Sequence, residues 1–213
     1  MSAGGHTGAG GRKGARSRKG ASGRKRTGAR KGAAGPAVPE RIYITGFMGS
    51  GKSTVGPLLA RGLGYQFIDL DAVIEEKEGR SIPELFDARG ESEFRAIEQR
   101  ELALLEVRER IVVATGGGAL TNPSTLDVVR RSGTLLYLNV DQETLFKRLR
   151  GVRGRPMISD ASGRPLSDDA LRERIKSLFA EREPLYKSAD IVVDGTSLTP
   201  EATVTSILTS LRA

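Results

Sequence analysis

A nine-residue segment from Gly46 to Thr54 has the residue types and the spacing needed to hold phosphate groups. It fits the pattern G-x-x-x-x-G-K-[ST], follows the β-branched, apolar run 42–45 and opens a helical pattern. The glycines allow backbone N–H groups to face phosphate oxygens, and the helix N-terminus adds a partial positive charge. We therefore expect a nucleotide site in which Lys52 reaches the β- and γ-phosphates and the Ser53 hydroxyl binds Mg²⁺.

Two carboxylates, Asp69 and Asp71, stand at the end of the predicted strand 66–70. Side chains two residues apart on an extended chain share a face, so both are expected to project from the strand end towards the phosphate loop. We expect Asp69 to support the metal, directly or through water, and Asp71 to bind a substrate hydroxyl. The alternative is that the pair only caps the helical run 72–78.

Two further features could meet a second substrate. Gly116–Gly118 follow the apolar strand 111–114, and three successive glycines allow close approach of the backbone to a ligand. Arg182 lies 11 residues after Leu171 and four after Leu178, on the same helical face. A guanidinium on an inward face needs a carboxylate or phosphate partner, unless it reaches solvent at the helix end.

Strand and helix signals alternate from residue 41 onwards, which predicts an α/β fold of the P-loop NTPase type with three layers, α/β/α, around a parallel sheet. A stretch rich in Gly and Pro, about 150–166, interrupts this pattern and predicts a lid, or alternatively a variable surface insertion. The five strands of the sheet are expected at 41–45, 66–70, 110–115, 134–140 and 190–193.

Composition separates a basic tail from a near-neutral domain. The 213 residues carry a net charge of +8, but residues 1–40 hold ten Lys and Arg and one acid, leaving 24 basic and 25 acidic residues in 41–213. We expect residues 1–38 to be disordered, or to touch nucleic acid or another polyanion weakly. With no Cys, no membrane span and no secretory signal recognised, we expect a soluble, cytoplasmic monomer.

Taken together, these segments resemble the shikimate kinase family over about 41–213, so that 39–213 is expected to be one kinase domain. The order and spacing of the motifs make the resemblance specific. The motifs are the GSGKST core of the phosphate loop, Asp69-x-Asp71, Gly90-Glu-x-Glu-Phe-Arg95, Gly116–Gly118, Arg155-Pro-Met-Ile158 and Glu181-Arg-Glu-Pro-Leu-Tyr186.

The resemblance implies ATP-dependent phosphorylation of the shikimate 3-hydroxyl, which gives 3-phosphoshikimate and ADP on the route to chorismate and the aromatic amino acids. It implies Lys52, Asp71 and Arg155 as catalytic residues, with Mg²⁺ held by Ser53 and Asp69. For Arg95 the resemblance alone supports a role, because in the sequence it reads as a solvated helix residue. The implied ATP contacts are Gly49, Ser50, Gly51, Lys52, Ser53, Thr54 and Arg155, and the implied shikimate contacts are Asp71, Arg95, Gly117 and Arg182.

The chain departs from the family pattern at the lid. The usual Arg-Pro-Leu-Leu is Arg-Pro-Met-Ile here, and a second Arg-Pro-Leu at Arg164 competes for the same role. We prefer Arg155, because Met157 and Ile158 preserve two apolar anchors. The lid is longer than usual, and 195–200 contains no arginine for the adenine side.

Two other functions fit parts of the sequence. A gluconate-kinase-like or nucleoside-monophosphate-kinase-like enzyme shares the phosphate loop and lid, but paired arginines with Asp71 favour a small polyhydroxylated carboxylate. A nucleotide-binding switch or nucleic-acid-associated protein could use the basic tail. The near-neutral charge of 41–213 argues against this second alternative.

Overall fold

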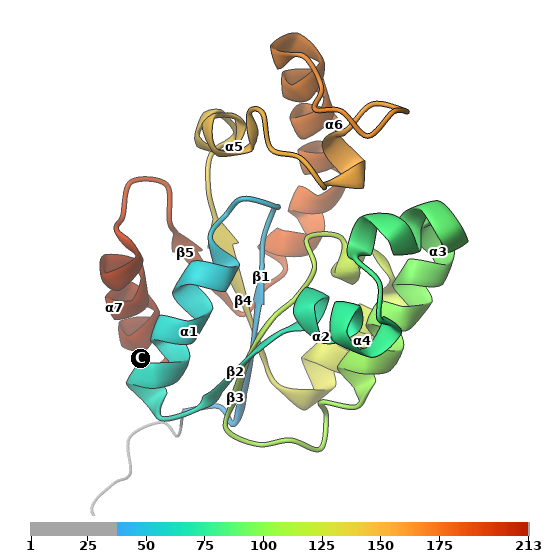
Figure 1. Ribbon diagram of the computed structural model, residues 1–213. Helices are drawn as coiled ribbons and strands as arrows, with labels where there is room; N and C mark the ends of the chain where they lie inside the picture. The colour runs from blue at the N-terminus through green and yellow to red at the C-terminus, as the bar shows by residue number, and fades with distance from the viewer. Residues whose placement is uncertain (1–37, 213) are drawn as a thin grey trace, which may run out of the picture. The chain divides into compact units, whose positions relative to one another are not determined.

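The structure is a computed structural model that describes residues 38–212 (Figure 1). The predicted tail therefore lies outside the described residues, apart from Val38. No helix in the described range is long and apolar enough to cross a membrane. The elements are β1 (Arg41–Thr45), α1 (Lys52–Leu63), β2 (Gln66–Asp69), α2 (Leu70–Glu78), α3 (Ile82–Ala103), β3 (Ile111–Ala114), η1 (Ala119–Thr121), α4 (Pro123–Ser132), β4 (Thr134–Asn139), α5 (Gln142–Leu149), η2 (Pro156–Ile158), α6 (Asp168–Lys187), β5 (Ile191–Asp194) and α7 (Pro200–Ser210).

The five strands form one parallel sheet in the order β2-β3-β1-β4-β5. Parallel strands require crossover connections, and the helices between them supply these. The fold class predicted from the alternation of strands and helices is confirmed. Because all strands run the same way, their carboxyl ends meet at one edge, where ligands bind in open α/β sheets.

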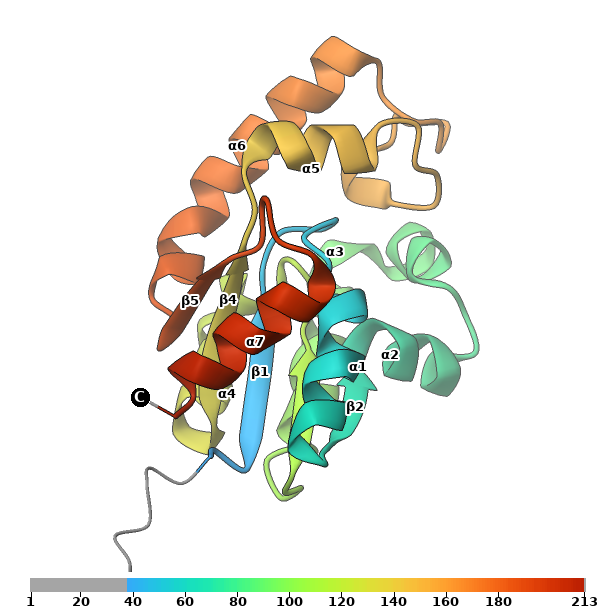
Figure 2. The same cartoon turned by 90° about the vertical axis from the view of Figure 1, so that its left-hand side faces the viewer.

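The strands alternate their side chains between the two faces of the sheet. On β1, Ile42 and Ile44 pack with the side chains of α1 and α7, which lie together in front of the sheet in Figure 2. Tyr43, between them, enters a second apolar cluster with residues of α3 and α4. This two-residue period places helices on both faces and buries residues 42–45 of β1.

A third apolar cluster lies at the carboxyl edge of the sheet, where α5 and the first part of α6 rise above the strands (Figure 1). The segment between these helices was expected to lack regular structure, but it contains the 3₁₀ turn η2 and a bridge between Ser159 and Pro165. Ile158, only 1% exposed, anchors the segment in the cluster, and Met157 packs against it. The segment is therefore fixed at η2 by apolar contacts.

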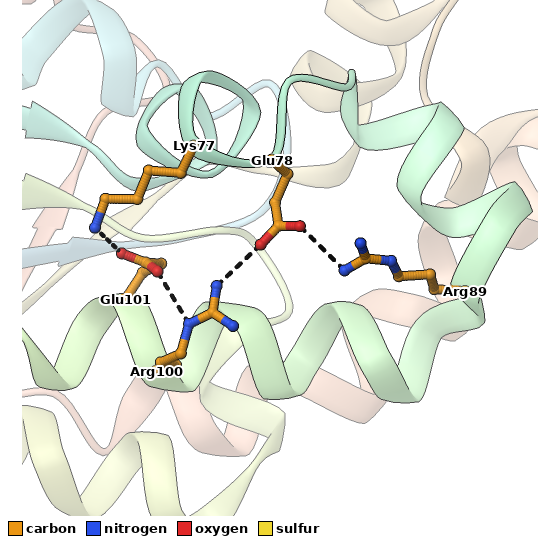
Figure 3. A network of polar contacts seen from close by, with 5 residues as sticks. All are labelled: Lys77, Glu78, Arg89, Arg100 and Glu101. Atoms are coloured by element: carbon orange, nitrogen blue, oxygen red, sulfur yellow. Dashed lines mark hydrogen bonds and ion pairs between the residues drawn. The ribbon is translucent and has the colours of Figure 1, made fainter.

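An ion-pair network joins α2 to both halves of α3, as Figure 3 shows. Helix α3 is broken at Gly90, which has φ 77° and ψ 172°. Glu78 of α2 contacts Arg89 before the break at 3.0 Å and Arg100 after it at 2.9 Å. The network of ion pairs continues through the buried carboxylate of Glu101, which contacts both Lys77 and Arg100. The network thereby ties the two halves of α3 to α2 across the break.

Candidate active site

The phosphate loop connects β1 to α1 at the carboxyl edge of the sheet. Gly49 and Gly51 adopt positive φ values of 78° and 102°, which side chains other than glycine rarely tolerate. Lys52 folds back over the loop, where its Nζ donates to the carbonyls of Gly46 at 2.8 Å and Phe47 at 3.1 Å. The ammonium group is thus held at the phosphate loop by two of its carbonyls.

Ser53 and Asp69 come together beside the loop, where the Ser53 hydroxyl donates to Asp69 Oδ2 at 2.6 Å. The sequence argument that Asp69 and Asp71 share the face of one strand is wrong. Strand β2 ends at Asp69, and Asp71 lies in the first turn of α2. Asp69 caps that helix by accepting from the Asp71 amide at 3.2 Å, yet both carboxylates still line the same cleft.

Two clefts of about 410 and 480 Å³ open at this edge. The first runs along the phosphate loop to Leu198 and Pro200 near the start of α7. The second lies between α2, α3, the glycine run and α6, beneath the lid. The two clefts share a set of lining residues, called here the common wall. These residues are Met48, Ser53, Asp69, Asp71, Gly117 and Arg155. A donor in one cleft and an acceptor in the other would meet at this wall.

The second cleft contains buried polar atoms that lack a partner within residues 38–212. They are Nε of Arg95, Nε of Arg182 and Oε1 of Glu98. Arg95 otherwise pairs with Glu98 and, at 2.9 Å, with Glu91. Arg182 is 2% exposed, so its guanidinium faces inward as its position on the apolar stripe predicted. Buried polar atoms without partners are rare in folded proteins and indicate a ligand or water.

The three glycines of the 116–118 run lie in close contact with other residues of the site. A Cβ at Gly116 would overlap the Glu98 carboxylate, and one at Gly118 would overlap the Arg95 guanidinium. At Gly117 it would lie 3.2 Å from the backbone nitrogen of Met48 in the phosphate loop. The run therefore lets the Arg95–Glu98 pair and the phosphate loop approach each other across a strip of bare backbone.

The two candidate lid arginines have different surroundings. Arg155 lines both clefts. Arg164 is 78% exposed in its side chain and pairs at 3.3 Å with Asp160 in its own turn. The geometry therefore favours Arg155 for a contact with the transferring group.

Sequence reasoning missed two residues of the site. Arg148 on α5 donates from Nη1 to the carbonyls of Gly49 at 3.1 Å and Ser50 at 3.2 Å, and it lines the first cleft. No local pattern distinguishes it from the exposed residues of its helix. Glu98 could have been found, since it lies three residues after Arg95 and so on the same helical face.

Burial raises the pKa of Glu98 to about 7, although the neighbouring Arg95 opposes the shift and Asp71 adds to it. The folded protein therefore binds this proton more tightly than the unfolded chain does. Stability contributed by the neutral form is complete below pH 4.5 and is lost as pH rises towards 7. The unfolding free energy of the wild type should therefore decrease from pH 5 to pH 7. In Glu98→Gln we expect this decrease to be smaller by about 1–3 kcal/mol.

Urea unfolding at pH 5 and pH 7 measures this difference. Glu91→Gln is the matched control, because Glu91 pairs with the same arginine from an exposed position and should keep the wild-type slope. An unaltered slope in Glu98→Gln would contradict the assignment.

Burial lowers the pKa of Lys52 to about 8, with Asp71 opposing the shift and Arg155 adding to it. In the free protein the ammonium group therefore loses its charge as pH rises through 8. We expect kcat/KM for ATP to fall above pH 8, whereas kcat should hold to higher pH because bound phosphates favour the charged form. Initial rates from pH 6.5 to 10 test this, and a kcat/KM that stays flat to pH 9.5 would exclude it.

A phosphate loop, a second cleft that shares Asp69 and Asp71 with the first, and an arginine-bearing segment that lines both are typical of P-loop kinases that phosphorylate small molecules. The family model described as shikimate kinase matches residues 48–212. The chain is 46% identical over 156 residues to a shikimate kinase of Chlorobium chlorochromatii, covering 73% of this chain and 82% of the relative.

Solved structures agree with this class. A shikimate kinase of Bacteroides thetaiotaomicron has a TM-score of 0.74 and 34% identity, covering 82% of this chain and 99% of that one. A shikimate kinase of Acinetobacter baumannii in complex with shikimate has a TM-score of 0.74 and 32% identity, covering 81% and 92%. This chain belongs to the shikimate kinase family, and it is an ATP-dependent kinase of a small molecule.

Proposed function

We propose that the protein transfers the γ-phosphoryl group of ATP to the 3-hydroxyl of shikimate, a step towards the aromatic amino acids. The observation that carries this proposal is the pair of inward-facing arginines, Arg95 and Arg182, each with a buried Nε that lacks a partner within the described range. Shikimate is a small ring with one carboxylate and three hydroxyls. Two guanidinium groups can hold its carboxylate, which leaves a hydroxyl to approach Asp71.

Residues of the phosphate loop would hold ATP in the first cleft, as expected from the sequence. The Ser53 hydroxyl and the Asp69 carboxylate, 2.6 Å apart, are hard oxygen donors that suit Mg²⁺. Within residues 38–212 no group of three or more His, Cys, Asp or Glu gathers at one point, which suits a cation that keeps waters and phosphate oxygens as its other ligands. Bound there, Mg²⁺ would neutralise charge on the phosphates.

Asp71 stands at the wall between the clefts, where it can orient the acceptor hydroxyl and accept its proton. Burial raises the pKa of Asp71, and Lys52 opposes that shift. A raised pKa makes the carboxylate a better proton acceptor. Because phosphoryl transfer has a loose transition state in most analyses, orientation should contribute more to the rate than proton removal.

Lys52 and Arg155 would both supply positive charge to the phosphoryl group during transfer. Lys52 is fixed by the two loop carbonyls, and Arg155 comes from the lid that lines both clefts. Closure of the lid over both substrates would exclude water and so prevent hydrolysis of ATP. Closure is expected to pivot near Gly151 and Gly154, which have positive φ, while Ile158 stays anchored.

Release of ADP in the presence of shikimate, gluconate or AMP tests the proposed acceptor. We expect turnover with shikimate alone, at a rate far above the ATP hydrolysis seen without an acceptor. Faster turnover with gluconate or AMP would refute the assignment.

The expected roles of the remaining parts are also proposals. ATP is abundant in the cytoplasm, and we propose that the protein acts there as a monomer. We propose that residues 1–38 contribute at most a weak, salt-sensitive contact with a polyanion. A protein that begins at Pro39 should keep kcat and both KM values within about twofold of the full chain. A large loss in this truncated protein would assign the tail a direct part in catalysis.

A further inference from the structure

The hydroxyl of Tyr186 makes a contact that the proposed mechanism does not use. It donates to the carbonyl of Gly117, a residue 69 positions earlier that lies on the wall between the two clefts. Tyr186 is only 2% exposed and lies four residues after Arg182 on the inward face of α6. The hydroxyl thus links the substrate-facing side of α6 to the glycine run.

The other carbonyls of the glycine run are satisfied locally. The Gly116 carbonyl accepts from the Ala119 amide at 3.1 Å, and the Gly118 carbonyl accepts from the amide and the hydroxyl of Thr121. Within residues 38–212, the Gly117 carbonyl has its hydrogen bond from Tyr186. Glycine has more backbone freedom than any other residue, so a peptide between two glycines needs an external restraint to hold one orientation.

A peptide group is planar, so fixing the Gly117 carbonyl also fixes the direction of the Gly118 amide. On its other side, Gly117 lies against the backbone of the phosphate loop, where a Cβ would come within 3.2 Å of the Met48 nitrogen. The glycine run is therefore held between the loop that binds the donor and the hydroxyl of Tyr186.

The surroundings of Tyr186 keep its hydroxyl protonated and in place. Burial raises the pKa of this hydroxyl to about 12, although the nearby Arg182 guanidinium opposes the shift. The ring stacks on Tyr137 of β4, with centroids 5.1 Å apart and an angle of 26° between the planes. A neutral donor with a fixed ring can direct the Gly117 carbonyl at any pH at which the protein is folded.

We propose that Tyr186 is a positioning residue that sets the orientation of the Gly117–Gly118 peptide, and through it the acceptor side of the cleft wall. It acts through the backbone and not by touching the reacting atoms. The expected change in KM for shikimate rests on the proposed function. The orientation of the Gly117–Gly118 peptide by Tyr186 does not depend on that function. Tyr186→Phe should therefore raise KM for shikimate about five- to tenfold and leave KM for ATP within twofold.

Tyr137→Phe is the matched control. Tyr137 belongs to the same stacked pair and also loses one hydrogen bond on substitution, because its hydroxyl donates to Asn139 Oδ1 at 2.8 Å. Neither Tyr137 nor Asn139 lines either cleft. We expect Tyr137→Phe to leave KM for shikimate within twofold, and equal increases in both variants would reduce Tyr186 to a packing role and overturn the proposal.

Hydrogen exchange separates this inference from the choice of acceptor. The amides of Ala119 and Thr121, which donate to the carbonyls of the run, should exchange faster in Tyr186→Phe than in Tyr137→Phe. If the wild-type protein failed to phosphorylate shikimate, the proposed function would fall, and the exchange comparison would still decide the role of Tyr186. Equal exchange in the two variants would overturn the inference whatever the acceptor.

Discussion

Replacing Lys52 with alanine is expected to lower kcat/KM for ATP by at least about 10³-fold, which corresponds to about 4 kcal/mol of transition-state stabilisation. The ammonium group lies over the phosphate loop, bound to two of its carbonyls, and would transfer these bonds to phosphate oxygens when ATP enters. Lys52 is half-buried in the first cleft, and water that takes the place of its side chain cannot supply a fixed positive charge. Steady-state rates with saturating shikimate measure the effect.

Lys52→Met provides the control for packing. Methionine keeps a long apolar stem in the loop but has no charge, so it should lose as much activity as alanine does while keeping the melting temperature nearer to that of the wild type. A Lys52→Met protein with activity close to the wild type would show that the stem, and not the ammonium group, supports catalysis. Lys176→Ala, at an exposed position of α6, should change neither quantity.

The fold was predictable because its signals are local. A phosphate loop between a β-branched strand and a helix needs only the residues from 41 to 63, and Asn122, Ser167 and Thr199 cap α4, α6 and α7 by accepting from amides two or three residues later. Each predicted strand matches an observed one to within a residue at either end. Local backbone preferences and two-residue periodicity are sufficient for this level of description.

The residues of the site were predictable where a local motif or a helical period indicates them. The structure brings Asp71, Arg95, Gly117 and Arg182 to one cleft, but the backbone reasoning for Asp71 used the wrong conformation. The Gly49 carbonyl meets Arg148 across 99 positions of the chain, and residue spacing cannot indicate such a contact. Partners of this kind are set by how helices pack on the sheet, which depends on the whole core.

Arg182→Ala is expected to raise KM for shikimate by at least about 30-fold, within a range of about 2–5 kcal/mol for one half of a buried charge pair. The side chain is 2% exposed, and its Nε has no partner in residues 38–212, so a bound carboxylate would find a guanidinium already desolvated. KM for ATP should change little, because the phosphate loop does not depend on this residue for its hydrogen bonds.

Removing a buried arginine also leaves a void, and two further variants separate this effect from the loss of charge. Arg182→Met fills most of the volume without charge, and it should bind shikimate as poorly as the alanine variant does. Arg182→Lys keeps the charge but loses the planar pair of donors, and it should recover only part of the affinity. Recovery of the wild-type KM by methionine would show that packing, and not recognition of a carboxylate, explains why Arg182 is buried.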